Sequence, residues 1–390
     1  MEPLDVYDPA FLADPYPAYA RLRDEDPVHQ VQPGAWLVSR YDDVTRILRD
    51  HDRFSSSPMN MGAPGFKFLI GSDPPDHTRL RRLVNKPFHP AAIAHLEPRI
   101  RSICADMVDG LIAANERGEA DLIEHVGYPL PVIVIAELLG IPSERRADFK
   151  RWSDAMLGGM SEDFDRGSGG LAAMEMFAYF NEVIEERRSH PGDDLVSLLV
   201  GGSEPLNNQE LLMFCMLLLV AGNETTTNLI SNGALALFDR PEAVAALRAD
   251  PSRIPAAIEE ALRFDAPVQG LMRATTEDAT LSDGTTVPRG NLVTILYGSA
   301  NRDERKYGPT ADDFIVDRYA GLKGVADHAG FGAGIHYCLG APLARLEAKV
   351  VAEALLERTR GMRRTGEGVR TSNLIVRGMK SLPVAFEPVG

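Results

Sequence analysis

Cysteine is scarce in this chain of 390 residues. The three cysteines, Cys104, Cys215 and Cys338, are odd in number and lie far apart in the sequence. This pattern argues against a disulfide framework and favours a reducing compartment. The chain also lacks two cysteines separated by two residues, so the cysteines do not predict a structural zinc site.

Long runs of basic or apolar residues are missing as well. No basic run exceeds RLRR, and the net charge of −15 argues against nucleic acid as the main partner. The longest apolar run, LLMFCMLLLVAG, is shorter than the roughly 20 residues that span a bilayer, so it predicts a buried helix and no membrane partner. The start of the chain lacks the basic and apolar regions of a signal peptide. These absences predict a cytoplasmic protein.

Periodicity predicts a mainly α fold with a minor β region. Of the residues, 44% are apolar and 25% charged, which is ordinary for a globular protein. No repeat or linker divides the chain, so we expect one domain over residues 1–390. Strand-like stretches occur near residues 30–60, 270–300 and 370–387, and helical patterns dominate elsewhere. The longest helix is expected from Asn208 to Phe238, ending before Pro241.

The segment FGAGIHYCLG places Cys338 in a loop with three glycines, Gly332, Gly334 and Gly340. Glycine permits positive φ and a close approach of the backbone to a flat or bulky group. A helix is expected directly after Cys338, with Pro342 in its first turn, and its free N–H groups would favour a thiolate. Such a thiolate could be a nucleophile or a metal ligand, although a lone cysteine in a turn is more often only a packed side chain.

The spacing F-x-x-G-x-H-x-C-x-G resembles the haem-binding loop of the cytochromes P-450, the haem-thiolate monooxygenases. The resemblance implies that Cys338 is the axial iron ligand of a haem b group, whose electron push favours O–O cleavage. His336 would donate to a haem propionate and Phe331 would pack beside the sulfur, with Gly332 and Gly340 next to the ring. The implied fold is a triangular helical prism, with the haem between the long central helix and the helix after the cysteine loop.

The segment IPAAIEEALRF places Glu260 and Arg263 on one face of a helix. A surface ion pair is the simpler interpretation of this pair alone. The resemblance instead implies a structural lock behind the haem. The family usually adds an arginine to this network at the place where this chain has Asp313, and Arg305 or Arg318 could replace it.

The segment VAGNETTT puts a polar cluster inside the expected long helix. A helix that emerges into solvent would explain it more simply. The resemblance implies that Glu224 and Thr225 relay protons to bound dioxygen, for which Ala221 and Gly222 leave room. The Thr225 hydroxyl could also bond a backbone carbonyl and open the helix ladder locally.

The segment HTRLRR puts His77 and Arg81 on one helix face. The resemblance implies that both bind haem propionates, together with Arg273. The expected substrate pocket above the haem is mainly apolar, with Gln269 as an orienting group. Besides Ala221, its residues are Phe66, Leu69, Ile70, Val268, Gln269, Leu271, Met272, Leu374 and Ile375.

The resemblance also implies the reaction and the partners. O2 and two electrons would insert one oxygen atom into a small, mainly apolar organic substrate, by hydroxylation, epoxidation or O-dealkylation, in secondary metabolism or catabolism. Electrons would come from NAD(P)H through a separate ferredoxin or flavodoxin-like protein, and the enzyme itself would be a monomer. The expected docking surface on the thiolate side is basic and consists of Arg79, Arg82, Lys86, Arg345 and Lys349.

Three alternatives stay open. A haem-binding sensor or carrier without turnover would not need the proton relay of Glu224 and Thr225. A Cys–His hydrolase would use Cys338 and His336, but residues two apart do not readily form an oriented nucleophile–base pair. A peroxide-driven enzyme of the same fold typically lacks the acid–alcohol pair.

Overall fold

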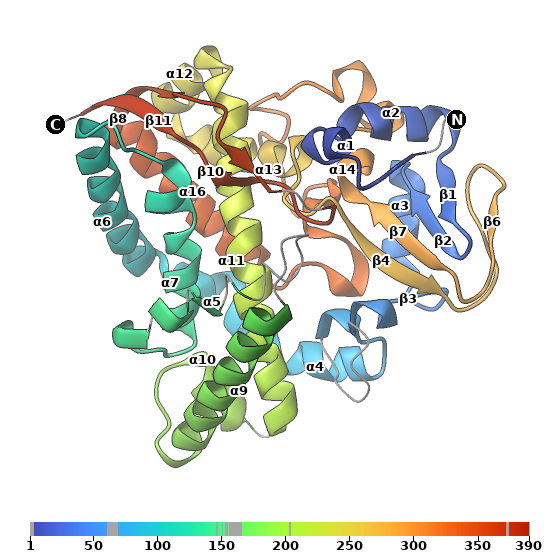
Figure 1. Ribbon diagram of the computed structural model, residues 1–390, viewed down its shortest axis with the longest axis horizontal. Helices are drawn as coiled ribbons and strands as arrows, with labels where there is room; N and C mark the ends of the chain where they lie inside the picture. Colours follow the sequence, from blue (N-terminus) through green and yellow to red (C-terminus); the bar gives the residue numbers. More distant parts are fainter. Residues whose placement is uncertain are drawn as a thin grey trace.

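Helix α11 (Asn208–Phe238) crosses the middle of the molecule, and the other elements are arranged around it (Figure 1). The computed structural model describes residues 4–60, 69–145, 147–149, 151–152, 155, 166–202, 204–371 and 374–389. Asn207 caps α11 through a reciprocal capping box with Glu210, and the helix ends before Pro241, at the boundaries expected from the sequence. By length and composition α11 could span a membrane, but 61% of its most apolar window is buried inside the molecule, as in a core helix.

Helices make up most of the described chain. Besides α11 they are α1 (Pro9–Ala13), α2 (Tyr16–Glu25), α3 (Tyr41–Arg49), α4 (Asp76–Val84), α5 (Pro90–Ala94), α6 (Glu97–Glu116), α7 (Pro129–Leu138), α9 (Arg166–Ser189), α10 (Leu195–Val200), α12 (Pro241–Ala249), α13 (Ile254–Phe264), α14 (Tyr297–Ala300), α15 (Glu304–Tyr307) and α16 (Ala341–Arg358). The largest hydrophobic core joins α6, α7, α9, α10, α11 and α16. The mainly α class with a minor β region is therefore confirmed.

The strands of the main sheet gather on the side of the molecule opposite α6 and α7 (Figure 1). The main sheet has the order β1 (Val28–Gln32), β2 (Ala35–Val38), β7 (Leu292–Leu296), β4 (Gly270–Thr275) and β3 (Phe54–Ser55). Only β2 and β7 run parallel among these pairs. Three two-stranded sheets pair β5 (Ala279–Thr280) with β6 (Thr286–Val287), β8 (Thr359–Arg364) with β11 (Val384–Pro388), and β9 (Val369–Arg370) with β10 (Met379–Ser381).

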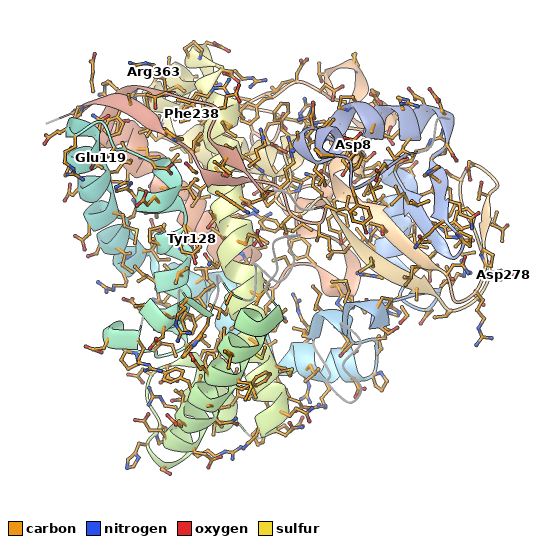
Figure 2. All side chains as sticks on the ribbon, viewed as in Figure 1. Asp8, Glu119, Tyr128, Phe238, Asp278 and Arg363 are labelled. Carbon is orange, nitrogen blue, oxygen red and sulfur yellow. The ribbon has the colours of Figure 1, made fainter. Side chains whose placement is uncertain are left out.

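Side chains fill much of the space between the helices and the main sheet (Figure 2). The turns that precede Cys338 contact α3, α13 and α14. Gly334 packs on the end of α3, where an added Cβ would lie 2.4 Å from the carbonyl oxygen of Leu48. Two short 3-10 turns, Ala329–Phe331 and Gly334–His336, lead to Cys338, and α16 begins three residues later. Packing on α3 and the start of α16 thus fix the place of Cys338.

Candidate functional site

A cavity lies between α11, α16, α4, α7 and strand β4, and its lining is mostly apolar. Cys338 lines it on one side, and the middle of α11 lines it on the other. Many of the residues predicted for the site meet here. They are Leu69, Ile70, Arg81, Ala221, Gly222, Thr225, Val268, Leu271, Arg273, Phe331, Gly332, His336, Cys338 and Gly340.

The backbone around Cys338 explains two of the three loop glycines. Gly332 and Gly334 have φ values of 69° and 68°, a region that favours glycine. The expectation of positive φ is wrong for Gly340, which has φ −82° and serves as the N-cap residue of α16. The Cys338 N–H donates to the carbonyl oxygen of Phe331 over 2.9 Å, which closes the loop on itself.

The environment of Cys338 shifts the pKa of its thiol in both directions. Burial raises the pKa of the thiol, while the backbone N–H groups of Gly340 and Ala341 and the guanidinium groups of Arg81 and Arg345 act to lower it. The helix-terminus effect expected from the sequence is therefore present, but burial outweighs it. A metal ion removes this penalty because a coordinating thiol is deprotonated outright.

Four basic side chains gather at one edge of the cavity: His77, Arg81, Arg273 and His336. The rings of His77 and His336 lie 4.3 Å apart between centroids. Burial and the neighbouring His77, Arg273 and Arg81 lower the pKa of His336 to about 3. His77 Nε2 is buried and has no hydrogen-bond partner among the described residues. Within that part of the chain neither arginine forms an ion pair with a carboxylate, so the cluster is short of negative charge.

This cluster fits a haem. Two propionates would supply the missing negative charge, and carboxylates are the natural partners of guanidinium groups. Cys338 provides an iron ligand in the same cavity, and the apolar walls suit the porphyrin ring. Ser56 is a residue of the site that the sequence did not reveal. Its hydroxyl lies 2.9 Å from His336 Nε2, and it is fully buried.

On α11 the hydroxyl of Thr225 donates to the carbonyl oxygen of Ala221 over 2.7 Å, as expected. Gly222 has a further reason to be glycine, because an added Cβ would lie 2.3 Å from Ile135 Cδ1 of α7. Glu224 is not among the residues that line the cavity. Burial raises the pKa of its carboxyl, while Lys380 acts to lower it. The Thr225 hydroxyl therefore lies at the cavity wall, whereas Glu224 lies outside the cavity lining.

The predicted substrate pocket needs correction. Leu69, Ile70, Val268 and Leu271 line the cavity, whereas Gln269, Met272, Leu374 and Ile375 do not. Phe66 lies outside the described residues.

The four described residues that do not line the cavity are placed elsewhere in the structure. The amide nitrogen of Gln269 donates to the carbonyl oxygen of Ala266 over 2.8 Å and to the Tyr16 hydroxyl over 3.4 Å, so its N–H groups are engaged outside the cavity. Met272 alternates with Leu271 along β4 and takes the other face. Leu374 packs in a separate cluster with the N-terminal helices, and the Ile375 carbonyl accepts from the Gln269 backbone N–H.

Glu347 is a second residue that the sequence reasoning missed. It lines the cavity from α16 and is only 1% exposed. Burial raises its pKa to about 8, and its Oε2 has no hydrogen-bond partner among the described residues. The sequence feature that could have revealed Glu347 is its position one helical turn after Leu343, which puts an acid on the apolar face of the helix.

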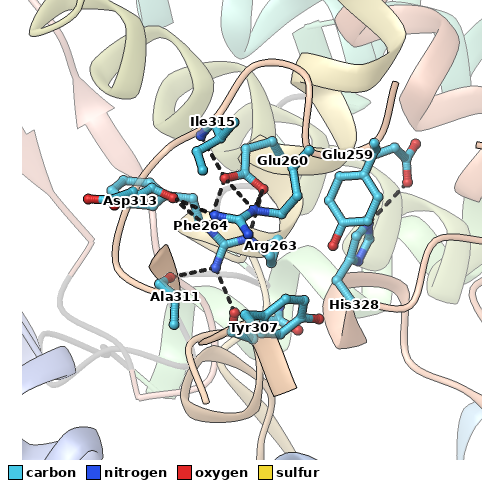
Figure 3. A network of polar contacts seen from close by, with 12 residues as sticks. Glu259, Glu260, Arg263, Phe264, Tyr307, Ala311, Asp313, Ile315 and His328 are labelled. Carbon is cyan, nitrogen blue, oxygen red and sulfur yellow. Dashed lines mark hydrogen bonds and ion pairs between the residues drawn. The ribbon is translucent and has the colours of Figure 1, made fainter. Parts of the chain in front are cut away.

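The pair Glu260 and Arg263 forms a buried network behind the loop (Figure 3). Arg263 donates to both carboxylate oxygens of Glu260 over 2.7 and 2.8 Å. Its remaining N–H groups donate to the backbone carbonyls of Asn301, Ala311 and Asp313. Arg318 donates to the Glu260 carboxylate over 3.0 Å, so it takes the third place in the network. Arg305 instead pairs with Asp24 and Asp303.

We predict that Arg318→Ala destabilises the protein, because it leaves the buried Glu260 carboxylate with one cation fewer. The expected loss is about 1–3 kcal/mol of unfolding free energy, the usual cost of a lost buried hydrogen bond to a charge. Arg82→Ala is the matched control, since both partners of its ion pair with Glu204 are exposed and its removal costs about 0.5 kcal/mol or less. Thermal unfolding of the haem-loaded variants measures both, and equal effects would contradict the assignment.

The expected basic docking surface is largely neutralised. Arg79 pairs with Glu210 and Arg82 with Glu204. Arg345 pairs with Glu259, and Lys349 lies 3.4 Å from Glu97. Lys86 alone among the five is exposed and without an ion pair in the described part of the chain.

The comparisons with known proteins agree with this geometry. A family model described as cytochrome P-450 matches residues 28–362. The monooxygenase PikC of Streptomyces venezuelae is 40% identical over 96% of this chain and 92% of that protein. The vitamin D(3) 25-hydroxylase of Pseudonocardia autotrophica is 39% identical over 98% of this chain and 96% of that protein.

Solved structures show the same fold. The cytochrome CYP109Q5 from Chondromyces apiculatus superposes with a TM-score of 0.88 at 40% identity, covering 99% of this chain and 98% of that one. CYP109E1 from Bacillus megaterium, in complex with testosterone, has a TM-score of 0.86 at 36% identity, covering 96% and 98%. With a cysteine-lined cavity suited to haem and relatives that match over nearly its whole length, this chain belongs to the cytochrome P-450 family of haem-dependent monooxygenases.

Proposed function

We propose that this enzyme inserts one oxygen atom of O2 into a small, mainly apolar organic substrate by hydroxylation, epoxidation or O-dealkylation, and that Cys338 would bind the haem iron. The observation that carries the proposal is the single cavity shared by Cys338, Thr225 and a mostly apolar wall. When bound, the haem supplies the activation of O2, using electrons that come from NAD(P)H. The protein residues hold the haem, shape the pocket and move protons.

In this proposal the basic cluster at the cavity edge holds the propionates. Arg81 and Arg273 offer charged N–H donors from α4 and β4, and His77 and His336 add ring N–H groups. Ser56 fixes the ring of His336 by a hydrogen bond to Nε2. Phe331 packs on the sulfur side, where its carbonyl holds the Cys338 N–H.

Thr225 and Glu224 provide the proton path. The single hydroxyl proton of Thr225 is donated to Ala221, so the hydroxyl oxygen presents its lone pairs to other donors. To release its proton into the cavity, the Thr225 hydroxyl must break its hydrogen bond to the Ala221 carbonyl. It must then receive another proton from a nearby acid. Glu224 is adjacent on α11, and burial favours its protonated form. We assign Glu224 as the proton source behind Thr225.

Several lines support an apolar substrate of limited size. Leu69, Ile70, Val268 and Leu271 contribute hydrocarbon side chains to the cavity wall. One relative is named a vitamin D(3) hydroxylase, and a related structure holds testosterone, so similar pockets accept apolar ring systems. We place the enzyme in secondary metabolism or catabolism, as a cytoplasmic monomer whose whole chain acts as one domain.

A separate ferredoxin or flavodoxin-like protein would dock on the thiolate side. The docking surface predicted from the sequence has five basic residues, and four of them form ion pairs with carboxylates. Lys86 begins the turn that joins α4 to α5, and α5 packs on α16, which follows Cys338. We therefore assign Lys86 the largest share of the attraction for an acidic donor, with Arg79, Arg82, Arg345 and Lys349 contributing less.

We predict that Lys86→Glu slows reduction by an acidic ferredoxin roughly threefold to tenfold at low ionic strength, because it reverses an unpaired charge at the docking surface. Arg289→Glu is the matched control, since it makes the same charge change at an exposed residue beside Asp278, at the far edge of the sheet side (Figure 2). Turnover driven by hydrogen peroxide, which needs no donor protein, stays unchanged in both. Stopped-flow reduction measures the effect, and unchanged reduction of Lys86→Glu would remove the docking assignment.

Reconstitution with a surrogate ferredoxin, its reductase and a library of apolar compounds tests the proposed reaction. A binder is recognised by a spin-state shift of the haem, and turnover under isotopically labelled O2 should place one labelled atom in the product. A protein that binds haem and ligands but never forms product would instead support the sensor or carrier.

A further inference from the structure

Two neighbouring carboxylates on α13 bind different partners. Glu260 binds Arg263 and Arg318, whereas Glu259 binds His328, as Figure 3 shows, and Arg345 of α16. Arg345 donates from Nε to Glu259 Oε1 over 2.5 Å and from Nη2 to Glu259 Oε2 over 2.9 Å. This two-pronged pairing uses the planar fork that only arginine offers.

His328 completes the network at its buried end. Its Nδ1 accepts a hydrogen bond from the Gly330 N–H over 3.1 Å, so the ring proton sits on Nε2. That nitrogen lies 3.0 Å from Glu259 Oε2 and donates to it. Burial opposes ionisation of Glu259, but hydrogen bonds from Arg345 and His328 prevail and lower its pKa to about 2. Glu259 is therefore an anion held by two donors.

The other face of Arg345 touches the cysteine loop. Its guanidinium carbon lies 4.6 Å from the ring centroid of Phe331, a cation–π distance. The Nη1 of Arg345 donates to the Tyr337 hydroxyl over 3.2 Å. Phe331 accepts the Cys338 N–H, and Tyr337 directly precedes Cys338. One guanidinium thus contacts both residues that hold the cysteine in place.

We propose that Glu259, His328 and Arg345 form a loop network in which Arg345 is a positioning residue for the Cys338 thiolate, acting through Phe331 and Tyr337. The inference rests on the assignment of Cys338 as the axial ligand. The network differs from the Glu260 network in its partners and its place, since it joins α13, the cysteine loop and α16. Its role is to fix the sulfur and to supply a compensating positive charge beside it.

The charges predict opposite signs for two variants. Arg345→Gln removes a cation near the sulfur and leaves Glu259 with His328 only, so adding an electron to the haem becomes harder and the reduction potential falls. Glu259→Gln removes an anion, so the potential rises. Arg345→Lys keeps the charge but loses the fork and the ring contact. It should leave the potential near that of the wild type, yet lose the thiolate bond several-fold more readily.

The experiment measures two properties of each haem-loaded variant: the reduction potential, and the fraction of the reduced, carbon monoxide-bound protein that keeps the thiolate spectrum. Arg358→Gln is the control, because Arg358 also lies on α16 and pairs with a carboxylate, Asp109, but at an exposed site. We expect this control to match the wild type in both properties.

The outcomes separate this inference from the proposed function. If Arg345→Gln and Glu259→Gln shift the potential in the same direction, or neither shifts it, the loop network has no role in setting the charge at the sulfur. If Arg345→Lys keeps the thiolate as firmly as the wild type, the positioning role is wrong. A wild-type protein without the thiolate spectrum would instead refute the assignment of Cys338.

Discussion

Cys338→Ala is expected to reduce oxygen insertion to the background level. Cys338 would be the only anionic ligand that the described loop offers to a haem iron in the cavity, and a thiolate ligand would supply the electron donation that oxygen activation needs. Alanine leaves the cavity and the basic cluster intact, so haem can still enter. The reduced protein with carbon monoxide should therefore lose the thiolate spectrum while it keeps some haem. Absorption spectra and product analysis measure both effects.

Cys104→Ala and Cys215→Ala are the controls for this prediction. Both thiols are buried in the hydrophobic core, and burial raises the pKa of each to about 12, so they are neutral side chains that serve packing. Their loss should cost some stability and leave the spectrum unchanged. If Cys338→Ala retains the thiolate spectrum, or if one of the controls removes it, the iron ligand has been assigned to the wrong cysteine.

Features that depend on short stretches of sequence could be predicted well. The limits of α11 follow from its capping box and from Pro241, and the start of α16 follows from Pro342 after the glycine-rich loop. The hydrogen bond from Thr225 to Ala221 joins residues one helical turn apart. In each case the partners are neighbours in the chain, so spacing alone decides which atoms meet.

Features that depend on distant segments could not be predicted. Arg318 reaches Glu260 across 58 positions, and only the fold decides that Arg318 and not Arg305 completes the network. Ser56 meets His336 across 280 positions. Gln269 suits a pocket by its polarity, but its amide donates to the nearby Ala266 carbonyl and, over 3.4 Å, to the hydroxyl of Tyr16, 253 positions away. Chemistry gives the kinds of partner that a side chain accepts, and tertiary structure selects among them.

The docking surface shows the same limit for charge. A run of cations in the sequence predicts a positive surface only when no carboxylate folds against it. Arg79 and Arg82 meet Glu210 and Glu204, which stand far away in the chain at the start of α11 and just before it. Net charge and local charge are therefore different quantities, and the second requires the structure.

Thr225→Ala is expected to divert electrons from product to hydrogen peroxide. The hydroxyl is the polar group of α11 that both lines the cavity and stands next to the half-buried acid Glu224. Without it, the cavity loses the hydroxyl of α11 that would deliver protons to it. We expect the product formed per NAD(P)H to fall roughly tenfold, less than the ~10²-fold or more that a lost general acid costs, because solvent still supplies protons. Oxidation of NAD(P)H should continue at a similar rate, and peroxide should account for the difference.

Thr225→Ser separates the hydroxyl from the methyl group. Serine keeps a hydroxyl that can reach the Ala221 carbonyl, so coupling of NAD(P)H to product should return close to the wild-type value. Because Glu224 lies outside the cavity lining, Glu224→Gln should slow turnover without opening the pocket, which places the acid upstream of the hydroxyl. A fully coupled Thr225→Ala enzyme would show that protons arrive by another path, and Glu347, buried on the same cavity with a raised pKa, would then be the first acid to replace.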